Sequence, residues 1–106
     1  MKIFEKLRKL RNFQKHFLPQ LNSLADFDIV RGIGYYQHRG TPLNMKALLR
    51  EVMGADATVQ RRLRRLTRLG VVLKRRARRD RRNLELYVSP RILKIYRRKA
   101  QLLRSA

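Results

Sequence analysis

The sequence of 106 residues contains no cysteine and no tryptophan, and few of its residues are acidic. The absence of cysteine excludes disulfide bonds and thiolate metal ligands. The two histidines, His16 and His38, stand apart from each other and from any recognisable set of metal ligands. Asp26 and Asp28 are expected on different sides of a helix, so they do not form an acid pair. We therefore predict that the protein is not an enzyme and uses no metal or cofactor.

The sequence also lacks a long apolar run. No segment is long enough to cross a bilayer. From Met1 to Leu18, lysines and arginines interrupt the apolar residues, whereas a signal peptide needs a continuous apolar stretch. We therefore expect no membrane partner and a cytoplasmic location.

Glycine is scarce, and Gly32-Ile33-Gly34 is the one place where two glycines lie close together. No predicted strand precedes this segment, and the rest of a dinucleotide-binding fingerprint is missing. Close packing of a helix is therefore favoured over phosphate binding.

Basic residues are abundant. Lys and Arg number 28 against seven acidic residues, which gives a formal net charge of +21. Five of the acidic residues occur by position 56, so the positive charge is concentrated in the second half of the chain. A surface of this kind favours a polyanionic partner.

Helical patterns fill the first half of the chain. Apolar residues recur at helical spacing from 2 to 18, up to Pro19, in a segment expected to cover the core or bind a partner chain rather than a membrane. Ser23 is a suitable N-cap for a second helix that runs to about His38. Asn44 is a suitable N-cap for a short helix over 45–53, and Leu43, which precedes this helix, is expected to pack on Leu48.

A second short helix follows a sharp turn at Gly54. Asp56 is predicted as its N-cap, Gly70 marks its end, and Val59, Leu63 and Leu66 share one face. Beyond it, the segments 71–76 and 84–88 have strand character around a polar tip, which predicts a β-hairpin. Ser89 is then a suitable N-cap, and Pro90 a suitable first residue, for a terminal helix over 90–104. The predicted fold is mainly α with a small β-hairpin wing, a single winged helix-turn-helix domain over 1–106.

The helix predicted over 56–69 carries most of the candidate binding residues. With its aliphatic side turned inward, the opposite side is almost wholly guanidinium. A helix of this diameter fits the major groove of DNA, where residues of its N-terminal half reach base edges. The predicted base-contacting residues are Ala57, Thr58, Gln60, Arg61 and Arg64, and those better suited to phosphates are Arg62, Arg65 and Arg68.

The tip of the predicted hairpin repeats this basic character. The stretch from Lys74 to Arg82 holds one acidic residue, Asp80, which we expect to pair with an arginine and fix either the tip or the recognition helix. An arginine at the tip can enter a minor groove, where the negative potential is concentrated. The predicted DNA-binding residues of the wing are Arg75, Arg76, Arg78, Arg79, Arg81 and Arg82.

Together, residues 43–88 resemble the winged-helix core of MarR-type bacterial transcription regulators. The resemblance lies in Thr58-Val59-Gln60-Arg61, in Leu66-Thr67-Arg68-Leu69-Gly70 and in Asp80-Arg81-Arg82. It implies that Arg82 enters the minor groove, that Asp80 holds the wing in place, and that the protein binds double-stranded DNA.

The resemblance also has departures. Ser89 stands where the family often has a threonine, and Pro90 replaces the glycine that usually follows it. The family dimerises through long terminal helices, which implies a homodimer formed by the helices at 2–18 and 90–104. It often senses small aromatic ligands, but no polar constellation in this sequence predicts such a pocket, and an effector stays unspecified.

These observations predict a sequence-specific, nucleoid-associated regulator of transcription in the bacterial cytoplasm. The alternative is an architectural nucleoid-type protein, or a basic protein associated with RNA or the ribosome, because charge alone gives strong nonspecific affinity.

Overall fold

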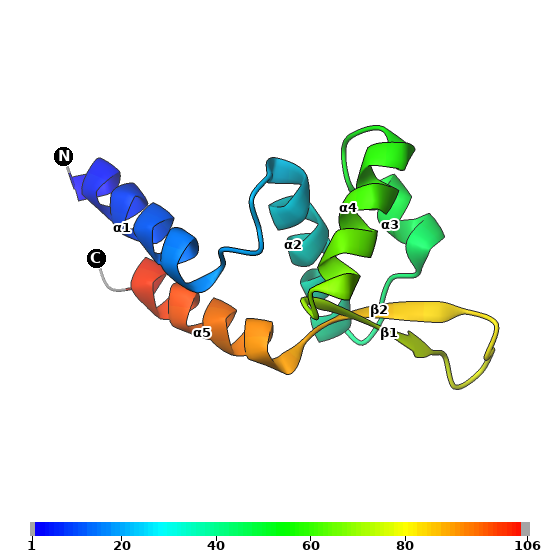
Figure 1. Ribbon diagram of the computed structural model, residues 1–106. Coiled ribbons are helices and arrows are strands. Elements are labelled where there is room, and N and C mark those ends of the chain that lie inside the picture. Colours follow the sequence, from blue (N-terminus) through cyan, green and yellow to red (C-terminus); the bar gives the residue numbers. More distant parts are fainter. Residues whose placement is uncertain (1, 105–106) are drawn as a thin grey trace.

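A computed structural model describes residues 2–104, which form five helices and one two-stranded sheet (Figure 1). This is the predicted winged helix-turn-helix, mainly α with one hairpin. In chain order the elements are α1 (Lys2–Phe17), α2 (Leu24–His38), α3 (Met45–Glu51), α4 (Asp56–Arg68), β1 (Val72–Arg76), β2 (Leu84–Val88) and α5 (Pro90–Arg104).

The core lies between α2, α3, α4 and the root of the hairpin. Helix α2 contributes Ile29, Val30 and Ile33, and it packs against both α4 and β2. A Cβ placed on Gly34 would lie 3.6 Å from Cγ2 of Val88, so α2 passes close to β2 at this glycine. The Gly32-Ile33-Gly34 segment thus lies within a packed helix and buries Ile33, although the contact of a Cβ at Gly34 would be an ordinary van der Waals one.

Three predicted caps are confirmed and one is wrong. The Ser23 hydroxyl accepts from the backbone N–H of Asp26, the Asn44 side chain accepts from that of Ala47, and Ser89 Oγ accepts from that of Ile92. Asp56, however, is the first residue of α4, and the N-cap is Ala55, which makes no side-chain capping bond. The Asp56 carboxylate still lies in the first turn, where it interacts favourably with the helix dipole.

Helix boundaries differ slightly from the predicted ones. Helix α3 ends at Glu51 rather than Met53, because Val52 turns to an extended conformation and buries its side chain in the core. Helix α1 ends at Phe17, and Leu18 is buried beyond it. Helix α4 ends at Arg68, after which Gly70 has a φ of 76°, a backbone conformation that favours glycine.

The wing is an antiparallel hairpin. Val72 pairs with Val88 and Arg76 with Leu84, so the root of the hairpin is apolar and the far end basic. Val71, predicted in the first strand, lies just before β1 and is buried. The backbone N–H of Leu86 donates to the carbonyl of Leu43 at 2.8 Å, which ties β2 to the segment before α3.

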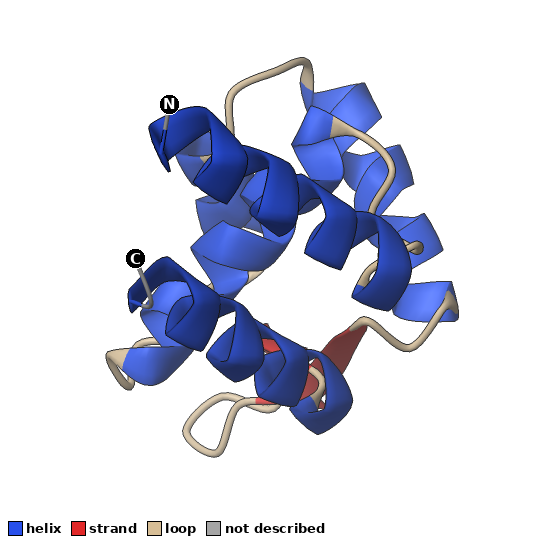
Figure 2. Cartoon of the chain, turned by 90° about the vertical axis from the view of Figure 1, so that its left-hand side faces the viewer, coloured by secondary structure: helices blue, strands red, loops and turns tan. Residues whose placement is uncertain are grey.

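Helices α1 and α5 lie side by side and extend away from the body of the fold (Figures 1 and 2). No residue of α1 is buried, and Ile3, Phe4 and Leu7 are each about half exposed or more. In α5, Ile92 is buried. Among residues 2–104, no helix has the length and apolar character needed to traverse a membrane.

Candidate nucleic-acid interface

Helix α4 has an apolar inner side and a cationic outer side. Val59, Leu63 and Leu66 are at most 1% exposed and belong to the core. The residues on the outer side were all predicted to contact DNA, and most of them lie open to solvent. Ala57, Arg61, Arg64 and Arg68 are exposed, whereas Thr58 and Gln60 are partly buried.

Two arginines of α4 do not lie on this open side. The guanidinium groups of Arg62 and Arg65 turn toward the start of α2, where Asp26 is fully buried. Arg62 Nε donates to Asp26 Oδ1 at 2.8 Å, and Arg65 Nη1 lies 3.5 Å from Asp26 Oδ2. The structure therefore does not group these two side chains with the other predicted residues on the open side of α4, because a buried carboxylate holds both of them.

The backbone beside Asp26 completes this cluster. Arg65 Nη1 donates to the carbonyl of Gln20 at 2.7 Å, and Arg62 also donates to the Asn22 side chain. Burial alone would raise the pKa of Asp26, but the hydrogen bonds from Arg62 and the Asn22 backbone and the charges of both arginines outweigh it. The pKa of Asp26 is therefore lower than its ordinary value. Asp26 is ionised at neutral pH.

Asp26 is the important residue that sequence reasoning missed. It was considered only as one half of an acid pair with Asp28, and the two do point to different sides of α2. A usable signal was present, because Asp26 shares its helical phase with Ile29, Val30 and Ile33. An acid on the apolar side of a helix requires a buried partner.

The tip of the wing is an exposed cationic loop. Asp80 Oδ1 accepts from the backbone N–H of Arg82 at 3.1 Å and lies 3.5 Å from Arg82 Nε. Of the two predicted roles for Asp80, the structure shows the local one, because its partner is in the tip and not in α4. Arg76 Nη1 donates to the carbonyl of Arg81 at 2.8 Å, and the Arg75 guanidinium lies over the ring of Tyr87. The Arg82 side chain is 96% exposed.

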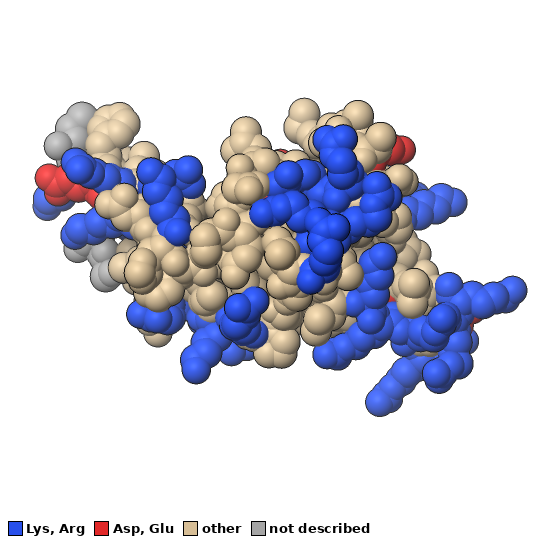
Figure 3. Space-filling view, in the orientation of Figure 1, with Lys and Arg blue, Asp and Glu red and all other residues tan. Residues whose placement is uncertain are grey.

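Lys and Arg gather over α4 and over the wing on the same face of the molecule (Figure 3). Further cations lie over α1 and α5, at the other end of this face. The few acidic residues leave the positive charge of the α4 side largely uncompensated. This face suits a polyanion.

The root of the wing is fixed to the rest of the fold. Asn44 Nδ2 donates to Asn83 Oδ1 at 2.9 Å, and the backbone N–H of Val88 donates to Gln37 Oε1 at 2.7 Å. With the bond between Leu86 and Leu43, these contacts join the hairpin to α2 and to the start of α3. They set the position of the cationic tip relative to α4.

A cavity of about 450 Å³ lies between α1, α2 and α5, and the sequence did not predict it. Phe27, Tyr96 and Lys99 line it together with Arg11 and Arg31. Burial raises the pKa of Tyr96 to about 12 and lowers the pKa of Lys99, which the charge of Arg31 lowers further. These side chains come from three separate helices, so no local pattern in the sequence indicates the cavity.

No group of three or more His, Cys, Asp or Glu side chains is placed to hold a metal ion within residues 2–104. His16 packs edge-on against Phe17, and His38 is exposed at the end of α2. The histidines are thus separated in space as they are in the sequence.

The fold and the placement of α4 and the wing define a winged helix-turn-helix protein. The sequence matches no protein-family model, and no curated protein is significantly similar to it. The similarity to solved structures is extensive, however, and it covers nearly the whole chain.

These solved structures are of MarR-type proteins. The DNA complex of S. aureus MepR covers 98% of this chain and 84% of its own, with a TM-score of 0.69 and 14% identity. The repressor CouR, bound to a 23-mer DNA duplex, covers 95% of this chain and 68% of its own, with a TM-score of 0.60 and 18% identity. The structure of MarR covers 95% of this chain and 77% of its own, with a TM-score of 0.55 and 26% identity. The chain therefore has the MarR-type winged-helix fold, as the sequence resemblance predicted.

Proposed function

We propose that this protein is a sequence-specific DNA-binding regulator of transcription that inserts α4 in the major groove and the wing in an adjacent minor groove. The observation that supports this proposal most directly is the exposed guanidinium side of α4, which lies beside an exposed cationic wing. Two of the proteins with the same fold, MepR and CouR, have been solved in complex with DNA, which supports this use of the fold. The proposed role is one of binding and not of catalysis.

The outer side of α4 divides into base-reading and phosphate-binding positions. Arg61 and Arg64 are long enough to form paired hydrogen bonds with guanine, and Gln60 can address adenine. Ala57 and Thr58, in the first turns, suit contact with a thymine methyl group. Arg68 lies near the end of the helix and suits a phosphate. Arg62 and Arg65 are left out, because Asp26 holds them.

In the wing we assign the minor-groove contact to Arg82. Its backbone and guanidinium are both linked to Asp80, which orients an otherwise fully exposed side chain. The remaining exposed arginines of the wing suit phosphates on either side of the groove. They are Arg75, Arg76, Arg78, Arg79 and Arg81.

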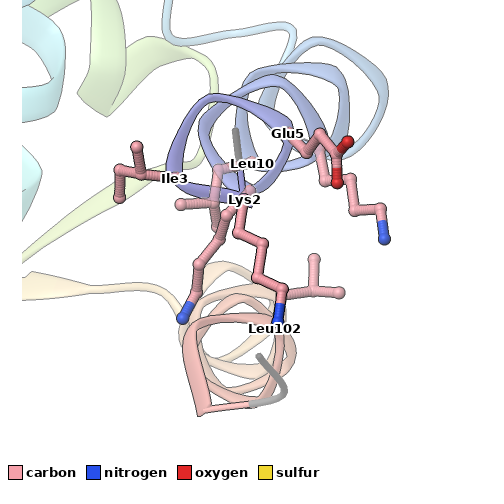
Figure 4. Close-up of a pocket in the computed structure, with 7 residues that line it drawn as sticks. Lys2, Ile3, Glu5, Leu10 and Leu102 are labelled. Carbon is pink, nitrogen blue, oxygen red and sulfur yellow. The ribbon is translucent and has the colours of Figure 1, made fainter.

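We further propose that two copies of the chain associate through α1 and α5. Ile3, Phe4, Leu7 and Leu103 leave an apolar side of this helix pair open to solvent. Near the ends of the two helices, Leu10 and Leu102 line a hollow of about 470 Å³ with lysines around it (Figure 4). A homodimer with twofold symmetry would bind two half-sites about one helical turn apart. The proposed dimer would act on the nucleoid in the bacterial cytoplasm.

A second candidate function is favoured by one observation. Twelve of the Lys and Arg residues lie in α1 and α5, away from α4 and the wing. Charge spread over both ends of the molecule suits an architectural protein that binds DNA of any sequence, or a protein that binds folded RNA.

Selection of bound duplexes from a random pool, followed by competition at physiological salt, separates these functions. A regulator should prefer its selected duplex to random DNA by roughly a thousandfold or more. Equal affinity for all duplexes would support the architectural function instead. Preference for folded RNA over every duplex would support the RNA-binding function, since the deep, narrow major groove of A-form RNA excludes a helix.

A further inference from the structure

We propose that Asp26 is a positioning residue that determines the specificity of DNA binding. It holds Arg62 and Arg65 away from the duplex and fixes the orientation of α4 about its own axis, so that, of these four arginines, only Arg61 and Arg64 are presented to the bases. This inference rests on the proposed function and adds a residue outside the interface to it.

The carboxylate of Asp26 is bound from several directions. Arg62 uses two nitrogens, with Nε 2.8 Å from Oδ1 and Nη2 2.5 Å from Oδ2. The backbone N–H of Asn22 donates to Oδ2 at 3.0 Å, and Arg65 Nη1 reaches the same oxygen at 3.5 Å. A two-pronged contact of this kind constrains the direction of the guanidinium, not only its distance. The first turn of α2 and the middle of α4 are therefore fixed to each other.

The sequence of α4 makes such a constraint useful. Arg61 and Arg64 are each followed directly by a second arginine, Arg62 and Arg65. Successive residues are about 100° apart around a helix, so the two pairs offer the groove two competing guanidinium faces. The buried aliphatic residues limit rotation, but long arginine side chains can still reach around the helix. Because Asp26 holds Arg62 and Arg65, their face of the helix does not compete with that of Arg61 and Arg64 for the groove.

The same contacts also remove charge from the DNA-binding surface. One ionised carboxylate neutralises part of the charge of two guanidinium groups, whose side chains are 22% and 26% exposed. Each cation that contacts a phosphate steepens the salt dependence of binding, with a slope of about 0.9 per contact. Release of both arginines should therefore raise the affinity for DNA of any sequence.

Asp26→Asn is the test, with Asp28→Asn as its matched control. Both substitutions remove one negative charge from α2, but the Asp28 side chain is 42% exposed and pairs with Arg31 at 3.6 Å instead of with α4. The binding of each variant to the selected duplex and to a scrambled duplex is measured over a series of salt concentrations. These measurements yield an affinity ratio and a salt slope for each protein.

For Asp26→Asn we expect tighter binding to the scrambled duplex, a salt slope steeper by up to about two, and at least a tenfold smaller preference for the selected duplex. Asp28→Asn should keep the preference and the slope of the wild type. A merely structural role for Asp26 would weaken binding to both duplexes together. That result, or an unchanged preference and slope, would overturn the proposal.

A triple variant, with Asp26→Asn, Arg62→Gln and Arg65→Gln, covers the case in which Asp26→Asn does not fold. Since the two arginines make no phosphate contact in the proposed complex, this variant should keep the salt slope of the wild type. A slope smaller by about two would overturn the proposal. If the wild type itself shows no preference among duplexes, the proposed regulator function fails, while the change in salt slope still tests whether Asp26 withholds two cations.

Discussion

Helices α4 and α1 have similar sequences in outline and opposite surroundings. Both are amphipathic and rich in Lys and Arg. The apolar side of α4 is fully buried, whereas α1 buries no residue and leaves Phe4 64% exposed. An amphipathic pattern thus predicts which side of a helix tends to be buried. It does not predict whether the same chain provides the residues that bury that side.

The two helices differ in electrostatics as well. Within residues 2–104, Asp26 is the one charged residue in the core, and it serves α4. The acidic residue of α1, Glu5, is exposed. Helix α4 is therefore oriented by specific contacts, while α1 is placed mainly by packing along α5.

The largest expected effect is on folding. Leu63→Ala, on the inner side of α4, should lower the free energy of unfolding by about 2–5 kcal/mol, because it leaves a cavity in the core. Leu7→Ala in α1 should cost less than about 1 kcal/mol in the monomer, since Leu7 is 49% exposed. Urea unfolding at low protein concentration measures both values. Equal losses would remove the contrast between the two helices.

The next effect is on DNA recognition. Arg61→Ala should weaken binding to the selected duplex by about 1–3 kcal/mol and relax base preference at one position. Arg68→Ala should weaken all duplexes alike, and Lys15→Ala, an exposed cation of α1, should have little effect. Titration of labelled duplexes compares the three. Identical specificity profiles for the Arg61 and Arg68 variants would contradict the division of roles in α4.

A third effect concerns the uncovered side of α1. Phe4→Glu should raise the dissociation constant of the homodimer at least tenfold, or about 1.4 kcal/mol, because it places a charge in the proposed apolar contact. The fold of the monomer should not change. Sedimentation equilibrium gives the association constant. A wild-type chain that is monomeric at all concentrations would contradict the proposed homodimer.

Arg82→Ala should have a smaller effect, of about 1 kcal/mol, as expected for one hydrogen-bonded contact. The loss should be greatest where the flanking DNA is rich in A and T, because a narrow minor groove concentrates negative potential. Duplexes that differ only in the flanks measure it, with Lys15→Ala in α1 as the control cation. Equal losses with every flank would contradict insertion of the wing.

The smallest effect is the dependence of stability on pH. The pKa of Asp26 is lower in the folded protein than its ordinary value of 3.8. Its contribution to stability is therefore present above about pH 4 and is lost as the pH falls through the lowered pKa. Thermal unfolding between pH 2 and pH 6 should show a shallower acid decline in Asp26→Asn than in the wild type. A parallel decline in both proteins would mean that Asp26 is not stabilised as an ion.

The sequence predicted the elements well because their signals are local. Apolar spacing, the caps at Ser23 and Asn44 and the contact between Asp80 and Arg82 all involve residues close together in the chain. The contacts of Arg62 and Arg65 were missed because their partner lies 36 or more residues away. Helical phase places a side chain on one side of a helix, but it does not show which acid lies opposite. The cap at Asp56 failed by a single residue, within the usual uncertainty of helix ends.

The hydrogen bonds at the root of the hairpin have a consequence for the geometry of any bound site. Leu43, Asn44 and Gln37 all hydrogen-bond to the hairpin, so its root keeps a defined position relative to α2 and α3. In the proposed complex, each base pair added between the contacts of α4 and of the wing would rotate one contact by about 35° relative to the other. In the proposed complex, the hydrogen bonds at the root of the hairpin would oppose that rotation, so the protein would set the spacing within each half-site.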